Sequence, residues 1–272
     1  MNVSLLLIAL LLYLLSTGAF LGYLITLRPM VRQAAHVLLV AAFVAHAAAL
    51  TLRAVHLGYE ATAPFQEELS YISGAMVGLY LVLAARLALT VVGALVTPLA
   101  FLFALSAYLF EAGAPPPSPA LQTLWLPAHV IPAFAGYAVF AVAFCLSLTY
   151  LLQEKQLKAK RRDGWFRHLP SLETLDNLNF RFVSWGFGLF TIGLITGSFL
   201  AKERWGELWS WEPVQIWSVI TWLLYAALLH ARTVGWRGRK AATLTIVGFV
   251  VLVASFVSVN LLTPGKHGGS FG

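Results

Sequence analysis

The chain has 272 residues, of which 60% are hydrophobic and 11% are charged. Soluble globular domains carry about 25% charged residues, so this composition excludes an ordinary soluble enzyme and indicates a membrane protein. The 18 lysines and arginines exceed the 11 aspartates and glutamates, and in a membrane protein such an excess marks cytoplasmic loops rather than a nucleic-acid surface. We therefore expect the lipid bilayer as a partner, and no nucleic acid.

Apolar segments long enough to cross a bilayer, which takes about 20 residues per helix, recur along the whole chain. They predict eight transmembrane helices, at about residues 3–27, 34–56, 69–88, 89–110, 123–152, 180–201, 213–233 and 241–262. The first lacks the basic residues that precede the apolar core of a signal peptide, so we expect it to be retained. The third and fourth are divided only near Arg86, which makes that boundary the weakest part of the count. The predicted fold is all-α, a single transmembrane domain over residues 1–272.

Basic residues lie in alternate connections of this arrangement. They follow the predicted helices one, three, five and seven, at positions 28 and 32, 86, 155–167 and 232–240. Because lysine and arginine concentrate in cytoplasmic loops, these connections are expected inside, and both termini outside the cytoplasm. The single cysteine, Cys145, lies within an apolar run and has no partner for a disulfide, so thiol chemistry is not expected of this chain itself.

Tryptophans crowd one predicted external loop, at about residues 201–217. Trp205, Trp209 and Trp211 lie within nine residues of one another, Glu212 follows them directly, and Trp217 lies just beyond. One interpretation is an aromatic belt at the membrane interface. The local density favours a second interpretation, an aromatic shelf for a large, flat, apolar ligand.

Several motifs in one order resemble the CcsA/ResC branch of the cytochrome c assembly family. The loop reads W-G-E-L-W-S-W-E-P and leads to a helix that ends L-H-A-R around His230. An H-x-x-x-L-x-x-R pattern runs from His46 to Arg53, the segment L-W-L-P-A-H-V contains His129, and V-N-L-L is followed by Gly265 and His267. The resemblance covers most of the chain after residue 40.

The resemblance implies a haem-handling protein of cytochrome c biogenesis. Such a protein binds haem b in the membrane and presents it on the extracytoplasmic face for covalent attachment to apocytochrome c, at a Cys-x-x-Cys-His sequence. It also implies a place as a subunit of a cytochrome c synthase, or haem lyase, complex with a ResB/CcsB-type membrane protein and a thiol reductant. We expect it in a bacterial cytoplasmic membrane rather than a plastid thylakoid membrane.

The resemblance assigns roles to the matching residues. It implies that His129 and His267 are external ligands of haem iron, and the basic-loop topology independently places both outside. It implies that His46 and His230 are ligands within the membrane. The remaining haem-binding residues implied are Trp205, Trp209, Trp211, Glu212, Trp217 and, for a propionate, Arg53.

The inner pair fits less well than the outer pair. At about 1.5 Å per residue, His46 lies about 18 Å along its helix from the inner end, whereas His230 lies about three residues from the inner end of its own. Whether these two share one haem is left open, because tilt could close such a gap. A lone histidine in a helix bundle can also serve as an interhelical hydrogen-bonding residue.

Two departures keep other functions open. Where the family carries Lys and Glu after the proline of the tryptophan motif, this chain has Val214 and Gln215. That loss favours, as an alternative, a non-catalytic or regulatory haem-binding membrane protein of the HemX type. A transporter of another solute is disfavoured, since polar residues gather at the external rim instead of lining several spans.

Overall fold

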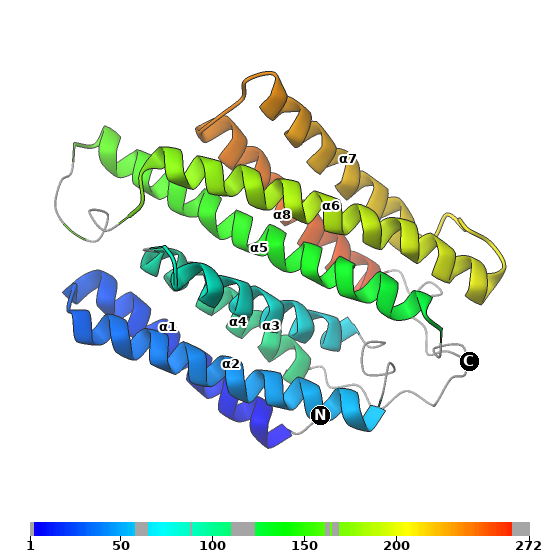
Figure 1. Cartoon of the computed structure of the whole chain (residues 1–272), viewed down its shortest axis with the longest axis horizontal. Helices are drawn as coiled ribbons and strands as arrows, with labels where there is room; N and C mark the ends of the chain where they lie inside the picture. The colour runs from blue at the N-terminus through cyan, green and yellow to red at the C-terminus, as the bar shows by residue number, and fades with distance from the viewer. Residues whose placement is uncertain are drawn as a thin grey trace.

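The computed structural model describes residues 3–57, 65–87, 89–109, 123–160, 164 and 169–262. Over these residues the chain forms helices joined by loops, without strands (Figure 1). The helices are α1 (Val3–Thr26), α2 (Pro29–Leu57), α3 (Phe65–Ala84), α4 (Thr90–Leu109), α5 (Trp125–Lys158), α6 (Leu172–Trp205), α7 (Pro213–Thr233) and α8 (Arg239–Leu262). All eight are long and apolar enough to cross a membrane, which confirms the predicted all-α fold and the division between α3 and α4.

Helices α5 and α6 are longer than hydropathy predicts. Each has 34 residues, about 51 Å at 1.5 Å per residue, against a hydrocarbon core of about 30 Å. Their extra turns are polar, so a search for apolar runs stops before the helix does. The early start of α6 is set by Ser171, whose hydroxyl accepts a hydrogen bond from the backbone N–H of Thr174 at 3.1 Å.

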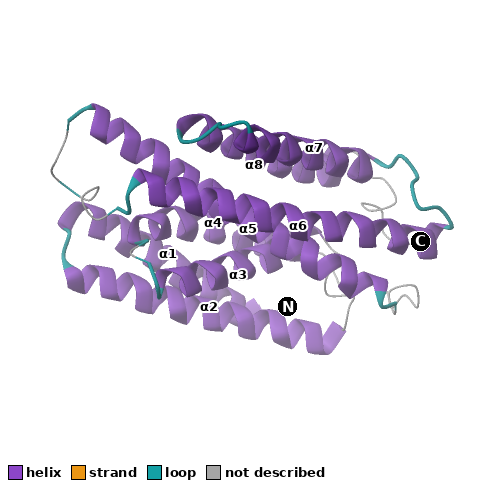
Figure 2. Ribbon diagram, turned by 45° about the horizontal axis from the view of Figure 1, so that its top comes forward, coloured by secondary structure: helices purple, strands orange, loops and turns teal. Residues whose placement is uncertain are grey.

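The pair α5–α6 forms the centre of the molecule. Helices α3 and α4 pack against α5 from the N-terminal half, and α7 and α8 cover the pair from the other side (Figure 2). Small residues bring α5 and α6 close together: a Cβ added at Gly193 of α6 would meet the Ala133 backbone of α5 at 3.2 Å. Small residues at a contact let two helices approach closely, which is how helices associate in lipid, where burying apolar surface gives little driving force.

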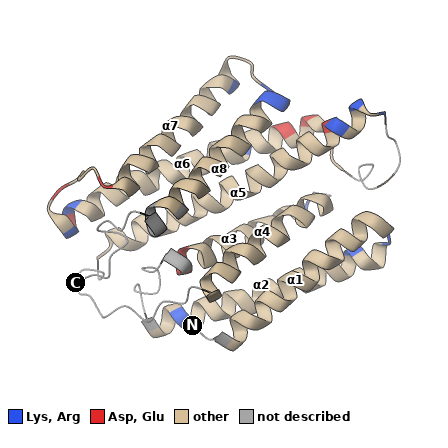
Figure 3. Ribbon diagram, turned by 180° about the vertical axis from the view of Figure 1, so that it is seen from behind, with Lys and Arg blue, Asp and Glu red and all other residues tan. Residues whose placement is uncertain are grey.

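The connections after α1, α3, α5 and α7 lie together at one end of the bundle (Figure 1). Lysine and arginine gather at this end, most densely around the α5–α6 and α7–α8 connections (Figure 3). At the opposite end α5 begins, α6 ends and α7 begins. We call this the outer end. Its extracytoplasmic side remains a prediction from the basic loops.

Candidate functional site at the outer end of the bundle

A cavity of about 200 Å³ opens at the outer end. Its walls come from the beginnings of α5 and α7, the last turns of α6, the outer half of α8 and one residue of α3. Most of the lining is apolar, and its polar side chains come from α3, α5, α6, α7 and α8. A concave, mainly apolar site with a few placed polar groups is typical of a small-molecule or cofactor site.

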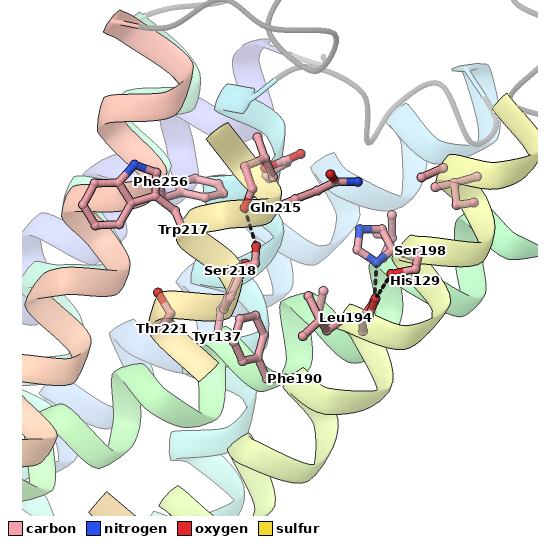
Figure 4. A pocket seen from close by; sticks show the side chains of 18 of the residues that line it. His129, Tyr137, Phe190, Leu194, Ser198, Gln215, Trp217, Ser218, Thr221 and Phe256 are labelled. Atoms are coloured by element: carbon pink, nitrogen blue, oxygen red, sulfur yellow. Dashed lines mark hydrogen bonds between the residues drawn. The ribbon is translucent and has the colours of Figure 1, made fainter. Parts of the chain in front are cut away.

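His129 projects into this cavity from the second turn of α5 (Figure 4). Its Nδ1 lies 2.8 Å from the backbone carbonyl oxygen of Gly193 on α6. A carbonyl only accepts hydrogen bonds, so Nδ1 carries the proton and donates. The other ring nitrogen, Nε2, is then left with its lone pair, the form in which imidazole binds a metal.

Gly197 makes room for this imidazole. A Cβ at Gly197 would lie 2.8 Å from both Cε1 and Nδ1 of His129. Any other residue there would push the ring away from its hydrogen bond. One turn of α6 therefore both holds the His129 ring, through the carbonyl of Gly193, and leaves the space for it.

Three of the four predicted indoles line the cavity. Trp205 ends α6, Trp209 lies in the following loop, and Trp217 reaches in from α7 on the side away from His129 (Figure 4). Trp211 is 74% exposed and lies outside the lining, and its ring meets that of Trp209 edge to face at 5.8 Å between centroids. The aromatic shelf is thus built mainly from three rings, with Trp211 supporting one of them.

The tryptophan loop is fastened at both ends. Gly206 closes α6 in the left-handed region, at φ 80°, and its N–H donates to the carbonyl of Lys202. At the other end the side-chain oxygen of Gln215 accepts hydrogen bonds from the Ser210 backbone N–H at 2.9 Å and the Ser210 hydroxyl at 3.3 Å. Gln215 stands out in the sequence as a departure from the family pattern, yet it fixes the loop that carries Trp209.

Glu212 occupies a different place from the indoles. It is the residue before α7, with extended backbone, and Pro213 takes the first position of the helix. Its carboxylate therefore lies by a helix N-terminus, where negative charge is favourable. Glu212 is not among the residues that line the cavity.

His267 lies outside the described residues, as does the whole segment after Leu262. The helix leading to it does reach the site, because Leu252, Ser255 and Phe256 of α8 form part of the cavity wall. Only four residues lie between the end of α8 and residue 267 in the sequence. The pairing of His129 with His267 stays a prediction.

The structure does not bring His46 and His230 together. His46 is fully buried on α2, where its Nδ1 lies 3.1 Å from the Tyr13 hydroxyl and its Nε2 lies 2.9 Å from the Ser70 hydroxyl. His230 is exposed near the end of α7, and α2 and α7 lie at opposite edges of the bundle (Figure 1). Both nitrogens of His46 are engaged in hydrogen bonds, so a ligand role for it requires at least Ser70 to give way.

Arg53 is likewise placed away from the cavity. It is 5% exposed, and its guanidinium lies 2.9 Å from the carboxylate of Glu67 on α3. This ion pair joins the outer ends of α2 and α3. The role of Arg53 toward a propionate stays a prediction without support from the position of its side chain.

Sequence reasoning missed several residues of the site. Glu68, Tyr137, Arg204 and Ser218 all line the cavity. Arg204 directly precedes Trp205, so the motif itself pointed to its neighbourhood. Glu68 gave no comparable signal, because nothing local shows that the first turn of α3 reaches a cavity built by the C-terminal half.

Comparisons with known proteins show the family of the chain. The family model described as Cytochrome C assembly protein matches residues 4–267. "Cytochrome c biogenesis protein CcsA" of Guillardia theta is 34% identical over 238 residues, which cover 80% of this chain and 79% of the relative. The protein of the same name from Prochlorococcus marinus (strain MIT 9303) is 34% identical over 252 residues, covering 81% and 79%.

The fold also has a counterpart among solved structures. "Cytochrome c Heme Lyase CcmF" superimposes with a TM-score of 0.66 at 19% sequence identity. The likeness covers 93% of this chain and 45% of that one, so the chain spans under half of that structure. At this identity the likeness concerns the fold alone.

Proposed function

We infer the function from the premise that this chain belongs to the cytochrome c assembly protein family, as a multi-pass membrane protein of cytochrome c biogenesis of the CcsA type. We propose that it binds haem b in the outer cavity and presents it for attachment to apocytochrome c. The acceptor would carry a Cys-x-x-Cys-His sequence, and the presenting face would be extracytoplasmic. The membrane we propose is the bacterial cytoplasmic membrane.

One observation carries the proposal: the hydrogen bond from His129 Nδ1 to the Gly193 carbonyl, made in a cavity walled by indoles. It turns a neutral Nε2 toward a space lined by flat aromatic faces. His129 would ligate the iron of an iron porphyrin, and the aromatic and aliphatic side chains of the lining would cover its macrocycle. The residues present fit the group.

The chain's own residues would bind and orient the ligand rather than attack it. His129, with His267 as its proposed counterpart, would hold the iron, and Trp205, Trp209 and Trp217 would cover the macrocycle and exclude water. Haem would supply the two vinyl groups to which the acceptor thiols add as thioethers. No thiol of this chain is placed to take part, since Cys145 is fully buried.

Further partners follow from the same proposal. A protein that only positions haem needs a source of reduced acceptor thiols, which we assign to a thiol reductant. A ResB/CcsB-type membrane protein would complete the synthase complex.

The test is the visible spectrum of the protein purified in detergent from haem-replete cells. We expect a low-spin, bis-histidine spectrum, loss of haem in His129→Ala, and its return on adding imidazole, which can enter the space left by the side chain. His56→Ala is the matched control, because His56 is exposed at the end of α2 and does not line the cavity. A colourless wild-type preparation, or a His129→Ala spectrum equal to that of His56→Ala, contradicts the proposal.

A further inference from the structure

The cavity carries one acid and one base. Among the described residues that line it, Glu68 and Arg204 are the only ones that are Asp, Glu, Lys or Arg. They come from different parts of the fold: Arg204 from the last turn of α6, and Glu68 from the first turn of α3. Helix α3 belongs to the N-terminal group of helices and packs against α5. Helix α6 also packs against α5, but it belongs to the group that contains α7 and α8. The two side chains therefore approach the cavity from different sides.

Arg204 is suited to receive an acid group. It is half-buried and precedes the cavity indole Trp205 in the same helical turn. A guanidinium offers a planar fork of N–H donors that matches a carboxylate, and it interacts well with aromatic faces. Partial burial strengthens that attraction by lowering the local dielectric.

Glu68 does not offer the same attraction to an acid group. Its neighbour Glu67 forms the ion pair with Arg53, at 2.9 Å, away from the cavity. Two consecutive acids of α3 are thus put to different uses, one closing the α2–α3 contact and the other facing the ligand space. A carboxyl group on the cavity wall offers no cation to an acid group of the ligand, so the α3 side of the cavity lacks the attraction that Arg204 supplies.

We propose that Arg204 fixes the orientation of a tetrapyrrole that carries its acid groups on one edge. The acid edge lies at Arg204, and the edge without acids lies toward Glu68. This inference rests on the proposed function and deepens it, since thioether formation requires the vinyl-bearing edge to be presented in one defined way. Arg204 is the positioning residue that distinguishes the two edges.

The test compares iron protoporphyrin IX with its dimethyl ester, which has the same ring, iron and vinyl groups but no acid. Apoprotein in detergent is titrated with each ligand, and the dissociation constants are read from absorbance. Wild type should bind the diacid at least about tenfold more tightly than the ester, the size expected for a charge-assisted hydrogen bond. Arg204→Gln should bring the ratio close to one, and Arg204→Lys should keep part of it.

Two controls keep the charges matched. Lys202→Gln removes a cation from an exposed position of the same helical turn and should leave the ratio unchanged. Glu173→Gln removes an exposed acid at the far end of α6 and should change neither dissociation constant.

A second readout reports orientation directly. Resonance Raman bands of the haem propionates should shift in Arg204→Gln and stay unchanged in Lys202→Gln. Equal binding of diacid and ester by wild type, or a wild-type ratio and propionate bands in Arg204→Gln, overturns the inference while the haem function stands. Failure of wild type to bind either ligand overturns the proposed function, and this inference with it.

Discussion

Replacing Gly197 by alanine probes the arrangement that positions His129. The new Cβ would lie 2.8 Å from the Cε1 and Nδ1 atoms of the imidazole. Carbon atoms pack best at about 3.5–4.0 Å, so the ring must withdraw by about 0.7 Å or more. Ligating groups have to be held within about 0.5 Å of their productive position. A single methyl group should therefore move the imidazole beyond that tolerance and lengthen its hydrogen bond to Gly193.

Gly188 offers a matched control in the same helix. A Cβ there would meet nothing within 4 Å, so Gly188→Ala should gain about 0.5–1 kcal/mol from helix propensity alone. Gly197→Ala gains the same propensity but also incurs overpacking, which typically costs about 1–3 kcal/mol. We expect it to be the less stable of the two by about that amount.

Two measurements on the purified variants decide the matter. Thermal unfolding followed by circular dichroism should rank Gly188→Ala above Gly197→Ala. The ratio of haem to protein after purification should fall about tenfold in Gly197→Ala and stay at the wild-type value in Gly188→Ala, since tenfold corresponds to about 1.4 kcal/mol of lost binding. Equal haem content and spectra in the two variants would refute the link between α6 and the imidazole.

Three further outcomes are expected. Trp209→Ala should reduce haem retention more than Trp185→Ala, since Trp185 is exposed on α6 away from the cavity; equal losses would favour an interfacial belt over a ligand shelf. Gln215→Leu removes the hydrogen bonds to Ser210 and should destabilise the closed position of the tryptophan loop by about 1–3 kcal/mol. Limited proteolysis should then cleave the loop faster, whereas an unchanged cleavage pattern would contradict the fastening role. Asp176→Ala should lower the free energy of unfolding by about 3–5 kcal/mol, because it leaves a buried arginine charge unmatched at the inner end; a loss no larger than that of the exposed Glu173→Ala would count against this contact.

The Asp176 contact shows how the inner end is held while the outer end stays hollow. Its carboxylate lies 2.7 Å from the Arg232 guanidinium and accepts the backbone N–H of Gly238 at 2.9 Å. This fastens the α7–α8 connection to α6. Helices α6, α7 and α8 are thereby tied at one end and separate around a cavity at the other.

The sequence alone determined the membrane class, the number of spans and the residues of the outer site that lie in one motif. Hydropathy is local, so eight apolar runs could be counted without knowing how they pack. His129 and the indoles could be proposed because their motifs are contiguous. The same local reading ended α5 too early and began α6 too late, because the polar turns of both helices at the inner end carry no apolar signal.

Only the tertiary structure decided which of these residues meet. Lipid and protein interior are similarly apolar, so the hydropathy of a span does not reveal its neighbours. This is why His46 could be matched with His230 along the sequence, although the fold places them at opposite edges. It is also why Glu68 could not be foreseen: its place in the site depends on α3 packing against α5, a contact between distant segments that no local pattern records.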